Sequence, residues 1–173
     1  NADLKDIQTA KVEVLFATVD EVIQEGNKAY EDNLKETRKK ASESNSSISS
    51  QELSEIKVDQ LTNDALLGMF NEKLNNLDEA TKAFIEMLPG WAILDLIATD
   101  EKILTSMKES IAFVVSDAMT QPIKNEEINE VKLEANNNLD YSDLDSNMQR
   151  IASLIVDNAI VENNIYNENA TEQ

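Results

Sequence analysis

Carboxylates are the side chains through which this chain could do chemistry, because it contains no histidine and no cysteine. Zinc sites of the usual kind need those residues as ligands, and Ser-His-Asp and Cys-His catalysis both require a histidine. No glycine-rich phosphate loop is present either. We therefore expect no catalytic residues, no cofactor and no enzymatic activity.

A possible calcium loop begins at Asp143 and continues through Asp145 and Asn147. The pattern then fails, because Met148 stands where such a loop needs glycine and Leu154 where it needs a bidentate glutamate. An aspartate-rich helix N-terminus explains the same residues. A loose calcium site remains as the alternative, and its candidate ligands are Asp140, Asp143 and Asp145.

A second group of candidates surrounds the Pro-Gly pair in the most apolar part of the chain, residues 77–123. Glu86 and Asp95 each interrupt an apolar run beside Trp91, the only tryptophan. Burial would raise the pKa of such carboxyl groups. The plainer interpretation places both on the polar side of short helices. If the protein binds a small ligand, we expect the pocket at Glu86, Trp91 and Asp95.

The charge of the chain limits its partners, since 34 acidic residues oppose 15 basic ones, a net charge of −19. This charge repels nucleic acids and anionic lipid headgroups. Residues 125–173 are the most acidic part, with only Lys132 and Arg150 as cations. We expect no nucleic acid partner, and this acidic quarter is the candidate surface for a basic protein partner.

The elements that must position these residues are helices, because three glycines and two prolines are too few for the turns of a β-sheet. The sequence predicts an all-α antiparallel bundle with about four main helices, one or two short ones and a long first helix. We expect a single domain over residues 3–166 and a frayed polar tail over residues 167–173.

Apolar spacing and capping residues place the individual helices. Ser49 and Glu52 form a capping-box pattern at the start of a second long helix, which would pair with the first as a hairpin. Asp78 caps a third helix, and Thr99 caps the longest helix of the apolar stretch. The predicted ranges are 3–42, 49–77 with a possible interruption at 62–64, 78–88, 90–98, 100–120, a marginal segment at 124–140, and a last helix from 142 or 145 to 164.

The first predicted helix carries a heptad-like seam that contains Val12, Leu15, Val19 and Val22 and continues through Gly26. Glycine on the seam would let a partner helix approach closely. Such a seam fits packing within one chain and homodimerisation equally well.

The start of the chain, Asn1-Ala2, resembles the remnant of a cleaved tag, and we expect a signal or membrane anchor to have been removed upstream. The leading hypothesis is a non-enzymatic extracytoplasmic interaction module: a bacterial lipoprotein, a secreted or surface protein, or a sensor ectodomain. A sensor ectodomain would point the ends of its first and last helices toward one membrane. The alternatives are a cytoplasmic or phage-derived regulator that binds a basic protein surface, and a carboxylate-based metal-binding protein.

Overall fold

The computed structural model describes the backbone of residues 3–171 and the side chains of residues 3–162. In this range the chain forms eight α-helices and one 3₁₀ turn, with no strand. The predicted all-α bundle with a long first helix is therefore confirmed. Residues 1–2, the predicted tag remnant, lie outside the described residues, as do the last two residues of the predicted tail.

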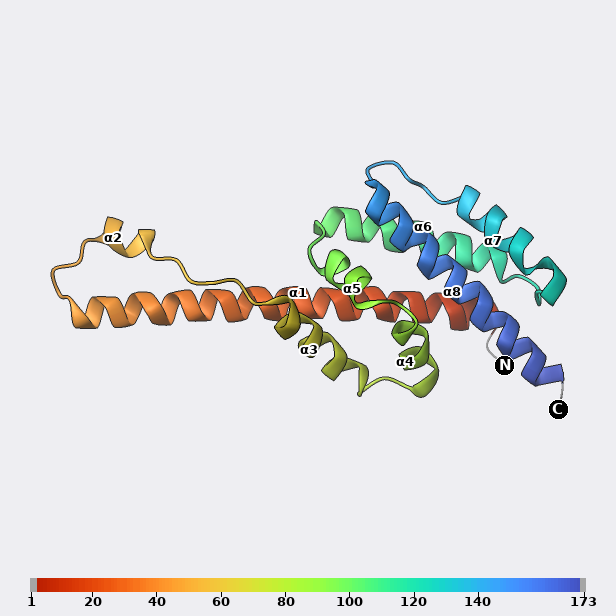
Figure 1. Ribbon diagram of the computed structural model, residues 1–173, viewed down its shortest axis with the longest axis horizontal. Coiled ribbons are helices and arrows are strands. Elements are labelled where there is room, and N and C mark those ends of the chain that lie inside the picture. Colours follow the sequence, from red (N-terminus) through yellow and green to blue (C-terminus); the bar gives the residue numbers. More distant parts are fainter. Residues whose placement is uncertain (1–2, 172–173) are drawn as a thin grey trace.

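Helix α1 (Leu4–Ser44) runs along most of the length of the molecule, and the other main helices pack against its first half (Figure 1). α6 packs along α1, and α8 packs against α6 and α7. The remaining elements are α2 (Ser50–Glu55), α3 (Asn63–Leu74), α4 (Glu79–Glu86), α5 (Gly90–Ile97), α6 (Glu101–Ala118), the 3₁₀ turn η1 (Asn125–Glu127), α7 (Ile128–Asn137) and α8 (Ser146–Thr171).

The core forms around the first half of α1, where the predicted seam turns inward. Burial of these apolar side chains is the main favourable contribution to folding. α6 and α8 supply the facing surfaces from the other end of the chain. The fully buried side chains include Val12, Leu15, Val19 and Val22 of α1, Ile111 and Val115 of α6, and Ile151, Ile155 and Ile160 of α8.

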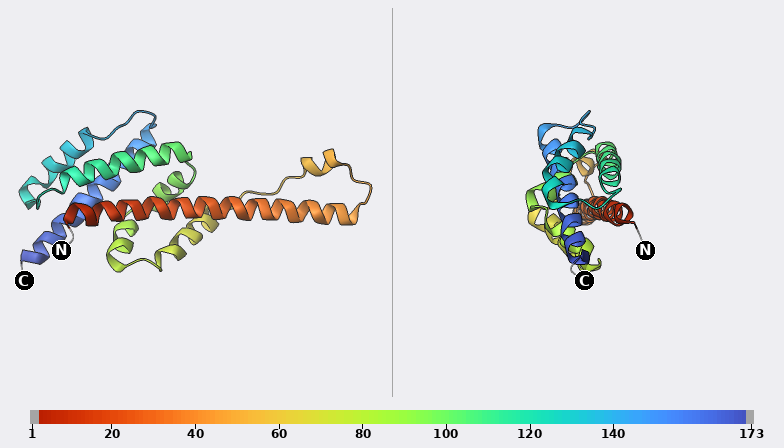
Figure 2. Two further views of the ribbon diagram at one scale, coloured as in Figure 1. Left: turned by 180° about the vertical axis from the view of Figure 1, so that it is seen from behind. Right: turned by 90° about the vertical axis from the view of Figure 1, so that its right-hand side faces the viewer.

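The second half of α1 leaves this core and projects as an arm, accompanied by α2 and the segment that returns to the core (Figure 2). We define the arm as residues 27–60 and the body as the rest of the chain. No residue between Val22 and Phe70 is buried, so the arm has no core of its own.

The predicted hairpin of two long helices is wrong. α2 ends at Glu55, and the chain has no regular structure again until α3 begins at Asn63. Thr62 starts that new helix, because its hydroxyl oxygen accepts a hydrogen bond from the Ala65 N–H at 3.1 Å. None of the intervening residues is buried, so this segment lacks the packed apolar face that stabilises most helices in proteins.

Side-chain caps fix several other helix starts. Ser49 and Asp78 accept hydrogen bonds from the first turns of α2 and α4, as predicted. Thr99 is not the cap of α6; Asp100 holds that position, and the Thr99 hydroxyl donates back to the Asp95 carbonyl at 2.6 Å. The segment predicted to be marginal forms η1 and α7. The frayed tail stays a prediction, since α8 is described as far as Thr171.

Candidate ligand cavity at the root of the arm

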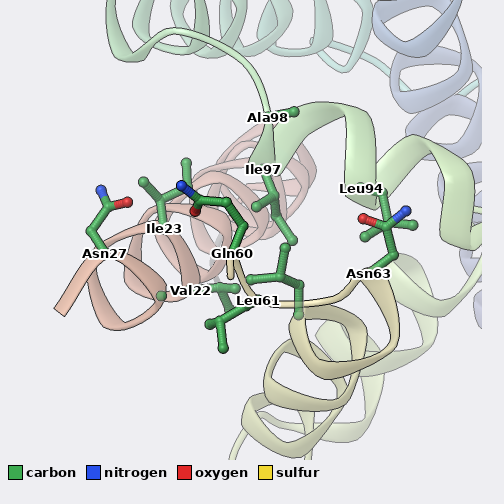
Figure 3. A pocket seen from close by; sticks show the side chains of 11 residues that line it. Val22, Ile23, Asn27, Gln60, Leu61, Asn63, Leu94, Ile97 and Ala98 are labelled. Atoms are coloured by element: carbon green, nitrogen blue, oxygen red, sulfur yellow. The ribbon is translucent and has the colours of Figure 1, made fainter. Parts of the chain in front are cut away.

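A cavity of about 200 Å³ lies at the root of the arm, where three segments meet (Figure 3). α1 forms one wall, the end of α5 forms another, and the chain entering α3 closes the third side. The lining residues are Val22, Ile23, Gly26 and Asn27 of α1, Gln60, Leu61, Asn63 and Leu66 around the start of α3, and Leu94, Ile97 and Ala98 around the end of α5.

Gly26 lies on the α1 wall of this cavity. A Cβ atom at that position would lie 3.4 Å from Leu66 Cδ2 and 3.6 Å from Leu61 Cδ1. Both are ordinary van der Waals distances, so an alanine would touch these leucines without a clash. The Thr62 cap turns the chain into α3 at this point, which brings Leu61 and Leu66 onto the same wall.

The chemistry of the cavity is neutral. Its walls are aliphatic, and no lining residue is charged. Three exposed carboxamides, Asn27, Gln60 and Asn63, stand among the lining residues. Their side chains make no hydrogen bond within the part of the chain that the structure describes, so their donors and acceptors can face a ligand. Aliphatic walls with a few polar groups are typical of small-molecule sites.

The residues predicted to form a ligand pocket lie elsewhere. Glu86 ends α4 as an exposed side chain, 3.8 Å from Lys82 Nζ. Trp91 lies in the first turn of α5, and the Arg150 guanidinium sits 4.9 Å from its ring centroid, a cation–π contact. Asp95 accepts a hydrogen bond from the Asn147 side chain. None of the three lines the root cavity.

The structure instead joins Asp95 to part of the predicted calcium site. Asp95, Asp100, Asp143 and Asp145 line a second cavity of about 360 Å³ between the end of α5 and the start of α8. Asp140 is not among the lining residues. Within the described residues, no three acidic side chains converge in a way that could hold a metal ion.

Local structure accounts for these aspartates. The Asp145 carboxylate accepts a hydrogen bond from the Met148 N–H at 2.8 Å and caps α8. Asp140 accepts hydrogen bonds from the hydroxyl and N–H of Ser142, which lower the pKa of its carboxyl group. Asp143 adopts a left-handed backbone with φ 68°, a conformation that aspartate tolerates in turns. This arrangement gives the calcium hypothesis no support.

A polar clamp joins the start of α1 to α8. The buried Gln8 side chain donates to the Ala159 carbonyl at 2.8 Å, and Lys11 Nζ lies 2.7 Å from Glu162 Oε1. We had not singled out these residues from the sequence. The sequence does contain a sign of them. Gln8 lies four residues before Val12, at a position of the seam where an apolar residue would be expected.

The clamp lies at the end of the molecule opposite the arm. The start of α1 and the C-terminal part of α8 lie together at that end (Figures 1 and 2).

None of the helices within the described residues combines the length and the apolar character that a membrane-spanning helix needs.

Comparison with known proteins identifies the family. The 7TMR-HDED model, described as 7TM-HD extracellular, matches residues 1–173. The chain belongs to the 7TMR-HDED family. No curated protein and no solved structure matches it. This 7TMR-HDED domain is the extracellular domain of a membrane sensor protein, so the predicted extracytoplasmic location is confirmed and the cytoplasmic alternative is wrong.

Proposed function

We propose that this 7TMR-HDED domain is a non-enzymatic sensor module that binds a small neutral molecule in the root cavity. When the ligand binds in the cavity, α1 would transmit the resulting change in position along its length to the polar clamp. The observation that carries the proposal is the continuity of α1, which lines the cavity at Val22 and Asn27 and reaches α8 through Gln8 and Lys11.

The size and chemistry of the cavity define the ligand class. Its volume of about 200 Å³ is below the roughly 300–1,000 Å³ typical of drug-sized ligands. Aliphatic walls favour an apolar body, and the three carboxamides favour one or two uncharged polar groups. A charged ligand would lose its hydration here without gaining a partner of opposite charge.

The clamp suits the role of an output element. It lies about 17 Å from the cavity, since eleven residues of helix separate Lys11 from Val22. Its contacts are polar and partly buried, so α1 and α8 cannot shift past each other without breaking specific bonds. We take α1 and α8 to have two arrangements in equilibrium. A ligand would shift that equilibrium only as far as it binds one arrangement better than the other. In this proposal the clamp end faces the membrane and the arm points away from it.

Nuclear magnetic resonance of the ¹⁵N-labelled chain tests the proposal with a panel of small neutral amides and alcohols as probes. We expect shifts at Gln60, Leu61 and Ile97, together with a smaller shift of the Gln8 side-chain amide. Ala98→Phe should abolish both, because Ala98 is an exposed lining residue whose enlargement fills the cavity. Ala83→Phe, on exposed α4 surface, is the matched control. Shifts that persist in Ala98→Phe, or that map to the Asp95 cavity, would contradict the proposal.

A further inference from the structure

The arm only partly covers its own apolar residues. Its apolar residues are only half-buried, and none reaches the burial of the core. A single helix with one short helix beside it is marginal in water, because most helical stability in proteins comes from packing an apolar face. These half-buried residues are Tyr30, Leu34, Ile48, Leu53, Ile56 and Val58.

The arm also differs from the body in charge. Residues 27–60 contain six basic and seven acidic residues, whereas the rest of the chain contains nine basic and 27 acidic ones. Two copies of this chain would repel each other strongly through their bodies. The nearly neutral arm is where two copies can approach with the least repulsion.

The arm contains two ion pairs within α1, Lys28–Asp32 and Lys40–Glu36, but other charges of the arm have no such partner. Lys35 and Lys39 lie on one face of α1, four residues apart, and α2 carries Glu52 and Glu55. All four side chains are exposed, and none forms an ion pair within the described part of the chain. The arm therefore carries two lysines on α1 and two glutamates on α2 that have no ion-pair partner within the described part of the chain.

Two hydrogen bonds hold α2 and these lysines of α1 at the same position along the arm. One guanidinium nitrogen of Arg38 donates to the Ser54 carbonyl at 3.0 Å and to the Ile56 carbonyl at 3.3 Å. α2 therefore lies beside the turn of α1 that carries Lys35 and Lys39. If a two-fold axis ran along the arm, α2 of a second copy would lie at the same position along it. Its glutamates would then face Lys35 and Lys39 of the first copy.

We infer that the arm is a homodimerisation surface, on which the lysines of one copy pair with the α2 glutamates of a second copy. α1 then has two uses: its first half packs within the chain, and its part in the arm pairs with a second copy. The parallel direction rests on the proposed function, which places the clamp ends of both copies at one membrane. The pairing itself follows from the charges of the arm.

Sedimentation velocity of the 173-residue chain in the micromolar range tests this inference. We expect a dimer that weakens with added salt. Lys35→Glu/Lys39→Glu and Glu52→Gln/Glu55→Lys should each raise the dissociation constant about tenfold or more. Glutamine at position 52 keeps the capping-box residue type, so α2 can still form. An equimolar mixture of the two variants should dimerise again, because their charges are complementary.

Lys102→Glu/Lys124→Glu is the matched control, since both lysines are exposed on the body and the change in charge is the same. It should leave the dissociation constant within about threefold of the parent value. A parent chain that stays monomeric, a control that weakens the dimer equally, or a mixture that does not dimerise would overturn the inference. These outcomes leave ligand binding in the root cavity untouched, so the two proposals fail separately.

A spin label at Ser47→Cys, the only cysteine in such a variant, tests the direction. Parallel arms place the two tips closer together than the arm's own length of about 27 Å. A longer distance would overturn the parallel arrangement.

Discussion

The body and the arm share one continuous helix, α1, but different interactions stabilise its two halves. In the body, α1 is surrounded, and the seam from Val12 to Val22 is fully buried. In the arm, the same helix has no buried residue, and Arg38 joins it to the α2 segment through hydrogen bonds to the carbonyls of Ser54 and Ile56. A continuous helix can thus pass from a region stabilised by hydrophobic burial to one stabilised by local hydrogen bonds.

This difference predicts two levels of stability within one molecule. Regions with few buried apolar contacts open at low free energy, whereas core helices open only with global unfolding. We therefore expect substitutions in the body to change the free energy of global unfolding. Substitutions in the arm should change local opening only.

The largest contrast should come from shortening an aliphatic side chain in each region. Ile155→Ala removes a side chain that is 0% exposed, and we expect it to lower the free energy of unfolding by about 2–5 kcal/mol. Leu34→Ala, on the half-buried face of the arm, should lower it by less than about 1 kcal/mol. Urea titration at low protein concentration measures both. Equal losses would show that the arm unfolds together with the body.

An intermediate effect is expected at the polar clamp. Lys11→Met leaves Glu162 without its partner in a partly buried position, where the two side chains are 10% and 19% exposed. We expect a loss of about 1–3 kcal/mol, less than for a fully buried pair. Lys11→Met/Glu162→Met should recover part of that loss, because no unpaired charge remains.

The corresponding exposed pair of the arm is Lys28 and Asp32, whose atoms Nζ and Oδ2 lie 2.8 Å apart. Lys28→Met should leave the urea midpoint unchanged, since solvent screens exposed pairs. A midpoint shift as large as that of Lys11→Met would remove the distinction between the two regions.

The helix caps give a smaller contrast and a pH dependence. Asp78→Ala should lower the free energy of unfolding by about 1 kcal/mol, because α4 packs in the body, whereas Ser49→Ala should affect α2 alone. Hydrogen bonds from the side chain and the N–H of Thr81 lower the pKa of Asp78 below its ordinary value of 3.8. The stabilisation is present above that ordinary pKa and is lost as the pH falls through the lower folded pKa.

Stability measured against pH for the parent and for Asp78→Asn checks this sign. The difference between the two should be constant at neutral pH and should change only in the acid range, below the ordinary carboxyl pKa. A change near neutral pH would point to a different group.

The smallest global effect is expected for Arg38→Lys, because it touches only the arm. Lysine lacks the planar guanidinium that reaches the carbonyls of Ser54 and Ile56. Amide hydrogen exchange should speed up in α2, while the urea midpoint stays the same. Lys40→Arg, on the same part of α1, is the control and should leave α2 exchange unchanged. Faster exchange throughout the body would show that the arm and the body are coupled.

Local signals in the sequence were sufficient for much of the fold. Apolar spacing located α1, α4, α5, α6 and α8, and side-chain chemistry identified the caps at Ser49 and Asp78. Both signals act within one or two helical turns, so they need no knowledge of distant residues. The prediction of a long second helix was wrong for a non-local reason. The apolar residues of the arm have no core to pack against.

The candidate sites depend on residues far apart in the chain, so the sequence does not show which of them lie together. Asp95 was singled out for its place beside Trp91, but the structure joins it to Asn147 and to a cavity that it shares with Asp143. The root cavity combines α1, the start of α3 and the end of α5. Of its lining residues, only Gly26 gave a hint in the sequence.

The sequence by itself determined the helical class, the positions of most helices, and the strongly acidic character of residues 125–173. Periodicity, capping and charge are local properties, which a linear chain displays directly. Only the tertiary structure decided that the first half of α1 packs in a core while the second half projects from it, and that Gln8 meets Ala159 across 151 residues. Burial is a property of what surrounds a residue, and those surroundings exist only after the chain has folded.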